Sequence, residues 1–405
     1  MIPFLLLFLC NSARSEHPNL VKDLPGLIFE PNFKTYSGYL HGHHKETFQM
    51  HYMLFESRSN ASEDPLIVWF NGGPGCSSML GAFSELGPFF PLPQGNGLFE
   101  NGIAIGNGKF NHVMNQLSTI IYNVYRGFYP LEEWAKMRNR CGVTDEFLYK
   151  ANADQIKCLT GKHIQSSTAK TEMEYNVYQS CNAEDMESHF MNMSQNPADY
   201  FWKYSSDNKR SFPCWALKKI EDYLNKKRTR SALNIPSHLR KEFTLCNDDV
   251  TYPYQGTHDT TVMFKKLLNI FKGDFRILIY SGDLDGVCPY IGTEWFLREL
   301  AIKANLTTSR NFTPWYYADL LHLRRPQPPA GYTRRYENSD GSKTIDYLTN
   351  AGHMVPMDAP GPSLHMISNF IHTPSAQDID YDSWQYYDDL PDPLPLRRAA
   401  KIIYV

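Results

Sequence analysis

The 405-residue sequence has little of several features that would identify other classes of protein. Beyond its first ten residues it contains no stretch approaching the roughly 20 apolar residues that a membrane-spanning helix requires. Acidic and basic residues nearly balance, 43 against 40, so the formal net charge is only -3. Without a basic excess there is no general attraction to nucleic acid or to an anionic membrane. The sequence therefore favours a small molecule or a peptide as the partner.

The N-terminus is expected to be a secretion signal. An apolar run over residues 1–10 is followed by small residues around Ala13 and Ser15, which suit cleavage by signal peptidase. We therefore assign residues 1–15 to a signal peptide and expect a soluble mature protein that is secreted or lysosomal. Glycosylation sequons agree with this route, at Asn60, Asn192, Asn305 and Asn311.

Cysteine is also scarce, and the count is informative. Removal of Cys10 with the signal would leave seven cysteines, which is an odd number in an oxidising compartment. Three disulfides and one free thiol is the simplest interpretation. The seven are Cys76, Cys141, Cys158, Cys181, Cys214, Cys246 and Cys288.

Apolar runs recur along the chain and alternate with segments of helical pattern. The predicted strands cover residues 36–40, 51–55, 65–70, 102–105, 275–280 and 344–348. The run at 65–70 is apolar throughout, which is typical of a strand buried on both faces. After the last strand, Leu364, Ile367 and Ile371 share one helix face. This alternation predicts an α/β fold.

The chain divides into a core in two parts with an insertion between them. Residues 16–124 and 246–372 carry the predicted strands. Residues 125–245 are rich in Lys, Asn and aromatic residues and have no long apolar run, so we expect a mostly helical cap there. Residues 373–405 form an acidic tail rich in Tyr and Pro, for which we expect no core of its own. A solvated terminus is the simplest interpretation of this tail, and a sorting or partner-binding segment is the alternative.

The loop at residues 71–78, which reads N-G-G-P-G-C-S-S, follows the third predicted strand. Its adjacent glycines let backbone N–H groups approach a ligand without an intervening side chain. An oxyanion hole requires donors of this kind, already pointed at the developing charge. For an isolated motif a plain tight turn would be the better interpretation. Two further loops, described next, favour the oxyanion hole instead.

Two further loops follow predicted strands in the second half of the chain. Asp285 lies in the segment S-G-D-L-D after the strand at 275–280, and His353 lies in G-H-M-V-P after the strand at 344–348. Loops at the carboxyl ends of parallel strands are where α/β enzymes build their sites. An Asp can orient a His that moves protons, and acid before base is the chain order of the α/β-hydrolase triad. Taken singly, each residue would more often be structural.

The nucleophile that such a pair serves is absent, because the sequence contains no G-x-S-x-G motif. Ser77 and Ser78 adjoin the glycine loop but lack the strand-to-helix turn that a nucleophile requires. The cluster His41, His43 and His44 could bind a metal, but no acid or cysteine ligand set accompanies it. A solvated turn is the better interpretation of that cluster.

Together these motifs resemble the serine carboxypeptidase family, and in particular its cathepsin A-like members. The resemblance rests on W-F-N-G-G-P-G-C-S-S at 69–78, E-L-G-P-F at 85–89, G-N-G at 106–108, G-D-L-D at 282–285 and G-H-M-V-P at 352–356. It implies an α/β-hydrolase fold with an inserted cap, and release of C-terminal residues through an acyl-enzyme. The implied partners are peptide substrates with a free C-terminus, a homodimer is kept open as an assembly, and no cofactor or metal is implied.

The resemblance also implies roles for single residues. Asp285 and His353 match the triad acid and base, and Gly73 matches an oxyanion donor. Asn71 matches a ligand of the substrate carboxylate, which Glu85 would support. The implied disulfides are Cys76–Cys246, Cys141–Cys158 and Cys181–Cys214, with Cys288 as the free thiol.

One departure from the family pattern concerns the junction between Asn101 and Gly102. In the family, two central strands and the nucleophile elbow lie between these positions, so a block of several dozen residues is expected to be missing here. A chain without that block would lack the Ser, and would expose unpaired strands. We therefore expect it to be inactive as written. The alternatives are a non-catalytic isoform that binds peptides or partners, and an incorrectly predicted gene whose true product is an ordinary enzyme.

Overall fold

The computed structural model describes most of the predicted core. The described residues are 17–25, 31, 33–42, 48–57, 66–73, 75–84, 102–143, 148–161, 175–177, 220–239, 241–252, 259–270, 275–317, 329–349, 351–372 and 401–404. Within these ranges no helix is both long and apolar enough to cross a membrane.

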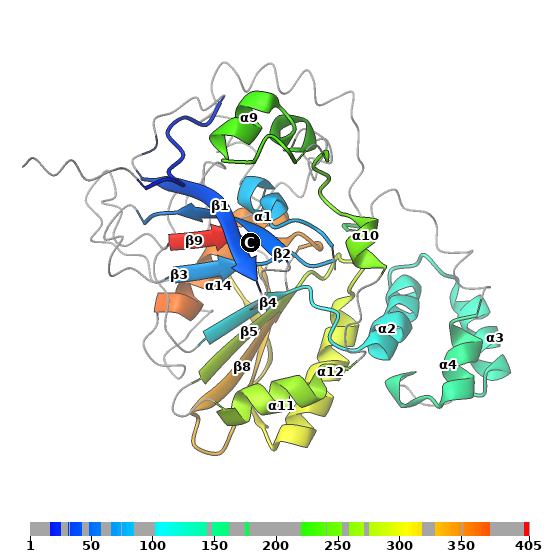
Figure 1. Ribbon diagram of the computed structural model, residues 1–405. Helices are drawn as coiled ribbons and strands as arrows, with labels where there is room; N and C mark the ends of the chain where they lie inside the picture. The colour runs from blue at the N-terminus through cyan, green and yellow to red at the C-terminus, as the bar shows by residue number, and fades with distance from the viewer. Residues whose placement is uncertain are drawn as a thin grey trace, which may run out of the picture.

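The strands form two separate mixed sheets (Figure 1). The first has the order β1-β2-β9-β3, with β1 Thr35–Gly42, β2 Phe48–Phe55, β9 Lys401–Tyr404 and β3 Leu66–Trp69. The second has the order β4-β5-β8-β7-β6, with β4 Gly102–Gly106, β5 Phe275–Ser281, β8 Lys343–Thr349, β7 Gly331–Glu337 and β6 Thr307–Trp315. Strands β4, β5 and β8 run parallel, and β7 and β6 extend that sheet antiparallel.

Helices follow β3, β4, β5 and β8 directly in the chain. In chain order the helices are α1 Met79–Ser84, α2 His112–Tyr125, α3 Leu131–Arg140, the 3₁₀ turn η1 Leu148–Lys150, α4 Ala153–Leu159, α9 Lys227–Ala232, α10 Asp248–Thr251, α11 Thr261–Ile270, α12 Tyr290–Ala304, α13 Val355–Asp358 and α14 Pro360–His372. Asn side chains cap the start of three of them, at Asn111, Asn152 and Asn247. Asn111 accepts a hydrogen bond from Met114 N at the start of α2, and Asn152 and Gln155 form a reciprocal capping box at α4.

The core of the five-stranded sheet is organised around β5, whose seven residues are all buried. Ile277 and Ile279 belong to the cluster formed with α2, α11 and α12. Leu278 and Tyr280 point the other way, into a cluster with Met366 and Phe370 of α14. This alternation follows from the period of two along a strand. The sheet is therefore covered by helices on both faces, which is the arrangement expected of an α/β domain.

A buried ion pair joins two strands of the same sheet. Arg335 on β7 lies opposite Asp346 on β8, and its guanidinium donates to both carboxylate oxygens, at 2.6 Å and 3.0 Å. Both side chains are almost inaccessible to solvent, 6% and 2% exposed. Because each charge depends on the other in this setting, the pair ties β7 to β8 in one register.

The predicted strands are confirmed as β1, β2, β3, β4, β5 and β8, and the predicted helix face lies on α14. The expectation that the third strand is buried on both faces is wrong. Leu66 and Val68 of β3 are each 46% exposed. Among the described residues β3 has a single partner strand, β9, so an edge position explains the exposure.

The interpretation of the tail as a solvated terminus is wrong for its last residues. Lys401–Tyr404 forms β9, which pairs antiparallel with β2 and parallel with β3. A strand of four residues can join a sheet without a core of its own, because its backbone groups are satisfied by its neighbours. The cap predicted at 125–245 is described only in part, through α3, α4 and α9, so its extent stays a prediction.

Candidate active site

Asp285 and His353 lie at the same edge of the five-stranded sheet. Asp285 follows β5 and His353 follows β8, and these two strands are parallel neighbours in the register Ser281 opposite Thr349. The carboxyl ends of both strands therefore open into adjacent loops. The two loops bond directly, because Leu284 N donates to Ala351 O at 2.9 Å.

Close approach of the loops depends on glycine at two positions. A Cβ atom at Gly282 would lie 2.0 Å from Gly352 O, which is far inside contact distance. A Cβ atom at Gly352 would lie 2.3 Å from Asp358 Oδ2 and 2.7 Å from Tyr175 O. Any side chain at either position would force the loops apart. The close packing of the two loops therefore explains the glycines that precede the acid and the base in the sequence motifs.

The Asp285 carboxylate is fully buried and fully bonded. Its Oδ1 accepts from the backbone N–H groups of Val287 and Cys288, at 2.8 Å and 3.0 Å. Its Oδ2 lies 2.7 Å from His353 Nδ1. Because a carboxylate only accepts hydrogen bonds, Nδ1 carries the proton and Nε2 is left to act as a base. The His353 side chain is 22% exposed, so the imidazole remains accessible.

Asn107 completes this carboxylate site, a role that was not predicted for it. Its side-chain amide donates to Asp285 Oδ2 at 2.8 Å, and its backbone N–H donates to Tyr280 O at 2.9 Å. The residue follows β4, the parallel neighbour of β5, and has a positive φ of 45°. The G-N-G motif was the signal that could have identified Asn107. It follows an apolar strand, and three adjacent parallel strands end at this edge of the sheet, so their loops meet.

Cys288 lies beside the pair and is free and buried. Burial and the neighbouring Asp285 raise the pKa of the thiol to about 12, so it is neutral and a poor nucleophile. Ligand atoms of Asp285, Cys288 and His353 lie within 4.8 Å of one another, close enough to suggest a metal site. The donors already described account for both carboxylate oxygens, so hydrogen bonding explains this cluster without a metal. His43 and His44 lie outside the described residues, and His41 contacts Gln49.

The predicted oxyanion loop follows β3, in the four-stranded sheet. Its backbone is held by the disulfide Cys76–Cys246 and by a hydrogen bond from Asn247 N to Gly75 O at 2.9 Å. Asn71 Oδ1 accepts from Trp69 Nε1 at 2.8 Å and from Gly81 N at 3.0 Å. The loop is therefore anchored on both sides, with Gly73 between the anchors at a φ of 146°.

Ser77 and Ser78 serve this loop and the start of α1. Ser78 Oγ accepts from Asn71 N at 3.1 Å, and Ser77 Oγ accepts from Met79 N at 3.3 Å. Hydroxyls in such positions satisfy backbone donors that a turn or a helix start leaves free. This explains both serines as structural residues.

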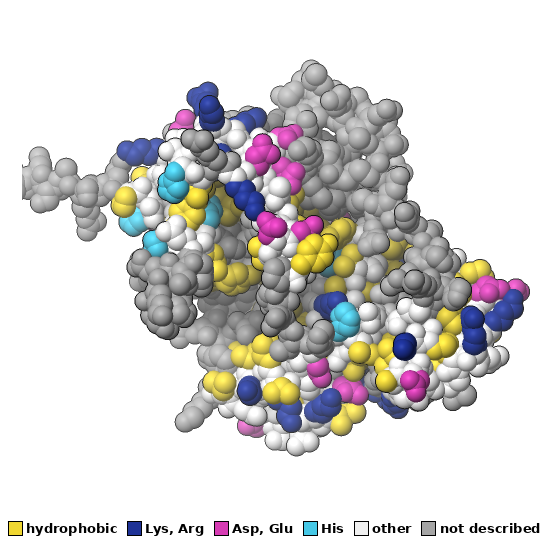
Figure 2. Space-filling view, turned by 45° about the vertical axis from the view of Figure 1, so that its right-hand side comes forward, with side chains coloured by type: hydrophobic (Ala, Val, Ile, Leu, Met, Phe, Trp, Pro, Cys, Tyr) yellow, Lys and Arg dark blue, Asp and Glu magenta, His cyan; other side chains and the backbone are white. Residues whose placement is uncertain are grey.

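Other predicted residues are placed as follows. The structure contains the disulfide Cys141–Cys158, and Asn305 and Asn311 are exposed. Glu85, Cys181, Cys214, Asn60 and Asn192 lie outside the described residues. On the face shown in Figure 2, acidic and basic side chains are interspersed, in agreement with the small net charge.

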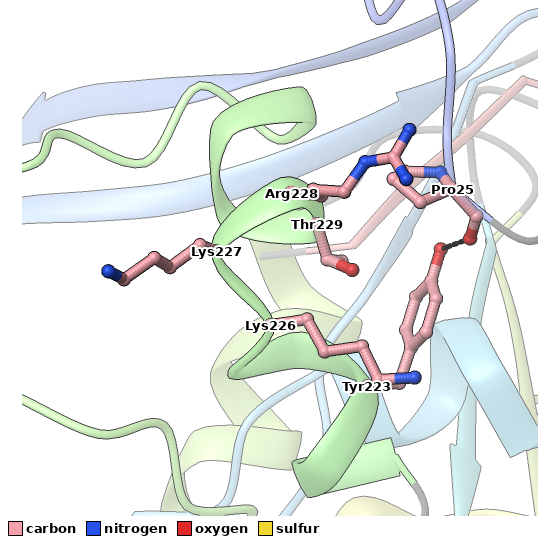
Figure 3. Close-up of a pocket in the computed structure, with 6 residues that line it drawn as sticks. All are labelled: Pro25, Tyr223, Lys226, Lys227, Arg228 and Thr229. Carbon is pink, nitrogen blue, oxygen red and sulfur yellow. Dashed lines mark hydrogen bonds between the residues drawn. The ribbon is translucent and has the colours of Figure 1, made fainter.

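A cavity of about 600 Å³ lies elsewhere, beside α9 (Figure 3). Tyr223 donates a hydrogen bond to Pro25 O at 2.8 Å across it, while the amine of Lys227 points away from the other lining residues. It contains none of the predicted site residues, so we do not assign it to the candidate active site. The lining residues are Pro25, Tyr223, Lys226, Lys227, Arg228 and Thr229.

Comparison with known proteins gives a consistent result. A family model described as serine carboxypeptidase matches residues 25–102 and 99–373, in two segments that meet between β3 and β4. Serine carboxypeptidase ctsa-3.1 of Caenorhabditis elegans is 28% identical, with 94% of this chain and 92% of the relative covered. Lysosomal protective protein of Mus musculus is 24% identical, with coverage of 91% and 98%.

The fold is also similar to that of a solved structure. A prohormone-processing carboxypeptidase from Saccharomyces cerevisiae superposes with a TM-score of 0.52 at 14% identity, over 84% of this chain and 92% of that chain. The alignment with the nematode relative extends over 542 residues, whereas this chain has 405. That relative therefore has segments without a counterpart here.

Proposed function

The chain belongs to the serine carboxypeptidase family, and we propose that it is a member that keeps the acid and base of the site but has no nucleophile for them to serve. In an intact member the base takes the proton of a Ser hydroxyl as its oxygen attacks the C-terminal peptide carbonyl, and water then releases the acyl-enzyme. The substrates would be peptides with a free C-terminus.

The observation that carries the proposal is the bonded pair Asp285 and His353. Asp285 accepts four hydrogen bonds and holds His353 with Nε2 free to accept a proton. In this assignment Gly73 N–H would stabilise the oxyanion, and Asn71 and Glu85 would hold the substrate carboxylate. The disulfide Cys181–Cys214 and glycosylation at the four sequons belong to the same proposal.

Absence of the nucleophile is supported by the sequence and by the position of the sheet break. The chain has no G-x-S-x-G motif. The two matched segments of the family meet at residues 99–102, and β3 and β4, which flank this junction, lie in different sheets. We infer that the missing block carried central strands together with the nucleophile elbow. Without a Ser hydroxyl, His353 has no proton to take, so acyl transfer should not occur.

The proposed cellular route rests on the sequence and on one relative. The apolar N-terminus, the sequons and the similarity to a lysosomal protective protein all favour a secreted or lysosomal protein. A capped α/β-hydrolase fold, with the cap over residues 125–245, is proposed on the same family basis.

A fluorophosphonate probe tests the proposal, because it labels only an activated Ser. We expect no labelling of the purified glycoprotein under conditions in which an active serine carboxypeptidase is labelled completely. Labelling that is lost in His353→Ala, and that peptide mapping places on a serine, would refute the proposal. The Ser77→Ala and Ser78→Ala variants identify which residue is responsible if labelling occurs.

Sequencing the native transcript across codons 101 and 102 separates the remaining alternatives. A transcript that joins Asn101 directly to Gly102 would establish the chain as a genuine non-catalytic product. A transcript with an inserted strand, G-x-S-x-G and helix would make the natural product an ordinary carboxypeptidase, and the proposal for this chain would then not apply to it.

A further inference from the structure

Three residues from a distant part of the chain lie across the loops that carry the acid and the base. Tyr175 O accepts a hydrogen bond from His353 N at 2.7 Å. Val177 N donates to Leu284 O at 3.1 Å, next to Asp285. The segment 175–177 is therefore hydrogen-bonded to both loops. Tyr175 bonds the loop that carries His353, called the base loop below, and Val177 bonds the loop that carries Asp285.

The middle residue of this segment makes a third connection. Asn176 is 3% exposed, and its side-chain amide donates to Asp358 Oδ2 at 2.9 Å. The same carboxylate oxygen accepts from Gly352 N at 2.9 Å, directly before His353. Asp358 closes the short helix α13, whose first residues also follow His353. The Asp358 carboxylate therefore links the side chain of Asn176 to the backbone of Gly352 in the base loop.

Ring packing and backbone geometry show that the base loop is tightly constrained. The rings of Tyr175 and His353 meet edge to face, with centroids 5.1 Å apart. Ala351, two residues before His353, has a φ of 60°, which is unusual for a residue with a side chain. Such a conformation persists where surrounding contacts determine it, and the segment 175–177 supplies several of them.

We propose that Tyr175–Val177 is a positioning clamp that holds His353 against Asp285, with Asn176 as its key side chain. Asn176 touches neither reacting atom, and it acts on the pair through Asp358 and the backbone of the base loop. The clamp explains how the pair stays assembled in a chain that has no nucleophile to stabilise it. The inference rests on the proposed acid–base role of Asp285 and His353.

The test breaks the clamp and reads out the Asp285–His353 hydrogen bond. Asn176→Asp replaces the amide donor with a second carboxylate beside Asp358, which removes the hydrogen bond and adds repulsion. Val177→Pro is a second variant, which removes the backbone donor to Leu284, replaces the packed Val177 side chain and restricts the backbone of Asn176. Asn225→Asp is the matched control, because Asn225 bonds Phe243 twice, away from both loops.

Two readouts are taken on every variant. One is the downfield NMR signal of the His353 Nδ1 proton, assigned by its loss in His353→Gln. The other is the rate at which diethyl pyrocarbonate modifies His353, measured by peptide mass mapping. Since a hydrogen bond to a carboxylate is worth roughly a tenfold change in an equilibrium, we expect the modification rate to rise about tenfold in Asn176→Asp. The rise should be smaller in Val177→Pro, because the hydrogen bond lost there joins two uncharged backbone groups. The NMR signal should broaden in both.

Asn225→Asp should keep both readouts near those of the unmodified protein. An unchanged pair in Asn176→Asp, or an equal effect of Asn225→Asp, would overturn the clamp. Circular dichroism identifies any variant that does not fold, and the other variant then decides. These readouts do not depend on turnover, so they succeed or fail independently of the probe experiment.

Discussion

The two sheets differ in how completely their strands are paired and covered. In the five-stranded sheet β5 lies between β4 and β8, and all seven of its residues are buried. In the four-stranded sheet β3 is an edge strand among the described residues, and Leu66 and Val68 are about half exposed. Both strands are apolar runs in the sequence. An apolar run therefore indicates that a strand suits an apolar environment. Whether the strand is buried depends on the strands and helices that lie beside it.

This difference coincides with the division of the candidate site. Asp285 and His353 follow β5 and β8, and their loops are held by many hydrogen bonds. The oxyanion loop follows β3 and depends on its own disulfide and caps. We infer that the missing block lies where these two halves would meet, so its loss removes the nucleophile and also interrupts the sheet.

The largest effect is expected from the buried ion pair of the five-stranded sheet. Arg335→Met removes the guanidinium that bonds both oxygens of the buried Asp346 carboxylate, and should lower the free energy of unfolding by about 3–5 kcal/mol. Urea denaturation followed by circular dichroism measures it. Lys241→Met is the control, because the Lys241–Asp249 pair is largely exposed and should contribute about 0–1 kcal/mol. Similar losses in both variants would show that the five-stranded sheet is not the more tightly packed half.

A matched pair of leucines compares the two strands directly. Leu278→Ala on β5 removes a side chain that is 0% exposed and should cost about 2–5 kcal/mol. Leu66→Ala on β3 removes one that is 46% exposed, and its cost should stay below about 1 kcal/mol. A large cost at Leu66 would mean that another segment covers β3.

Acid should act on the four-stranded sheet through His51 of β2. Its Nε2 bonds Ser37 Oγ, and burial lowers the pKa of the imidazole from 6.5 to about 4. Between these values the unfolded chain binds a proton that the folded chain does not, so stability falls as the pH drops from about 6.5 toward 4. One proton gives a slope of at most about 1.4 kcal/mol per pH unit.

The variant His51→Gln keeps a donor for Ser37 and removes the titration. Thermal melts between pH 7 and pH 4 should therefore show a smaller loss of stability in this variant than in the parent chain. His238→Gln, at an exposed position, is the control. Identical pH profiles for His51→Gln and the parent would contradict the assignment.

The smallest effect on stability is expected at the edge of β3 that has no partner strand among the described residues. Val68→Lys should change the free energy of unfolding by no more than about 0.5 kcal/mol but reduce self-association, because a charge on an edge strand blocks pairing with another chain. Sedimentation velocity over a concentration series measures this. Ile302→Lys, at a 72% exposed position on α12, adds the same charge away from any edge and should leave association unchanged. Equal effects of the two variants would show that net charge alone governs association.

Much of the fold could be predicted because apolar runs and their periodicity indicate the type of an element, even where they do not fix its burial. The strands β5 and β8 and the helix α14 were located from that pattern alone. Strand β7 was missed because its inward-facing Arg335 pairs with Asp346 and breaks the apolar pattern. Strand β9 was missed because its apolar run is very short and follows a polar tail, and because its pairing with β2 and β3 is a long-range contact.

The candidate site could be predicted in the same partial way. The loops of Asp285 and His353 were identified because their motifs follow apolar strands. The roles of Asn107 and Asn176 were not, because an Asn is common in loops and its partner is set by the tertiary fold. Sequence patterns identify the residues that react more readily than those that hold them in place.

Hydrogen exchange of the β4 and β5 amides tests the central claim most directly. In a parallel pair, successive N–H groups of a strand point to alternate sides, so a strand with one neighbour protects only half of them. We predict slow exchange throughout the interior of β5, and slow exchange at only alternate residues of Gly102–Gly106. Uniform protection of β4, equal to that of β5, would mean that a strand already occupies its open edge, and would contradict the inferred break in the sheet.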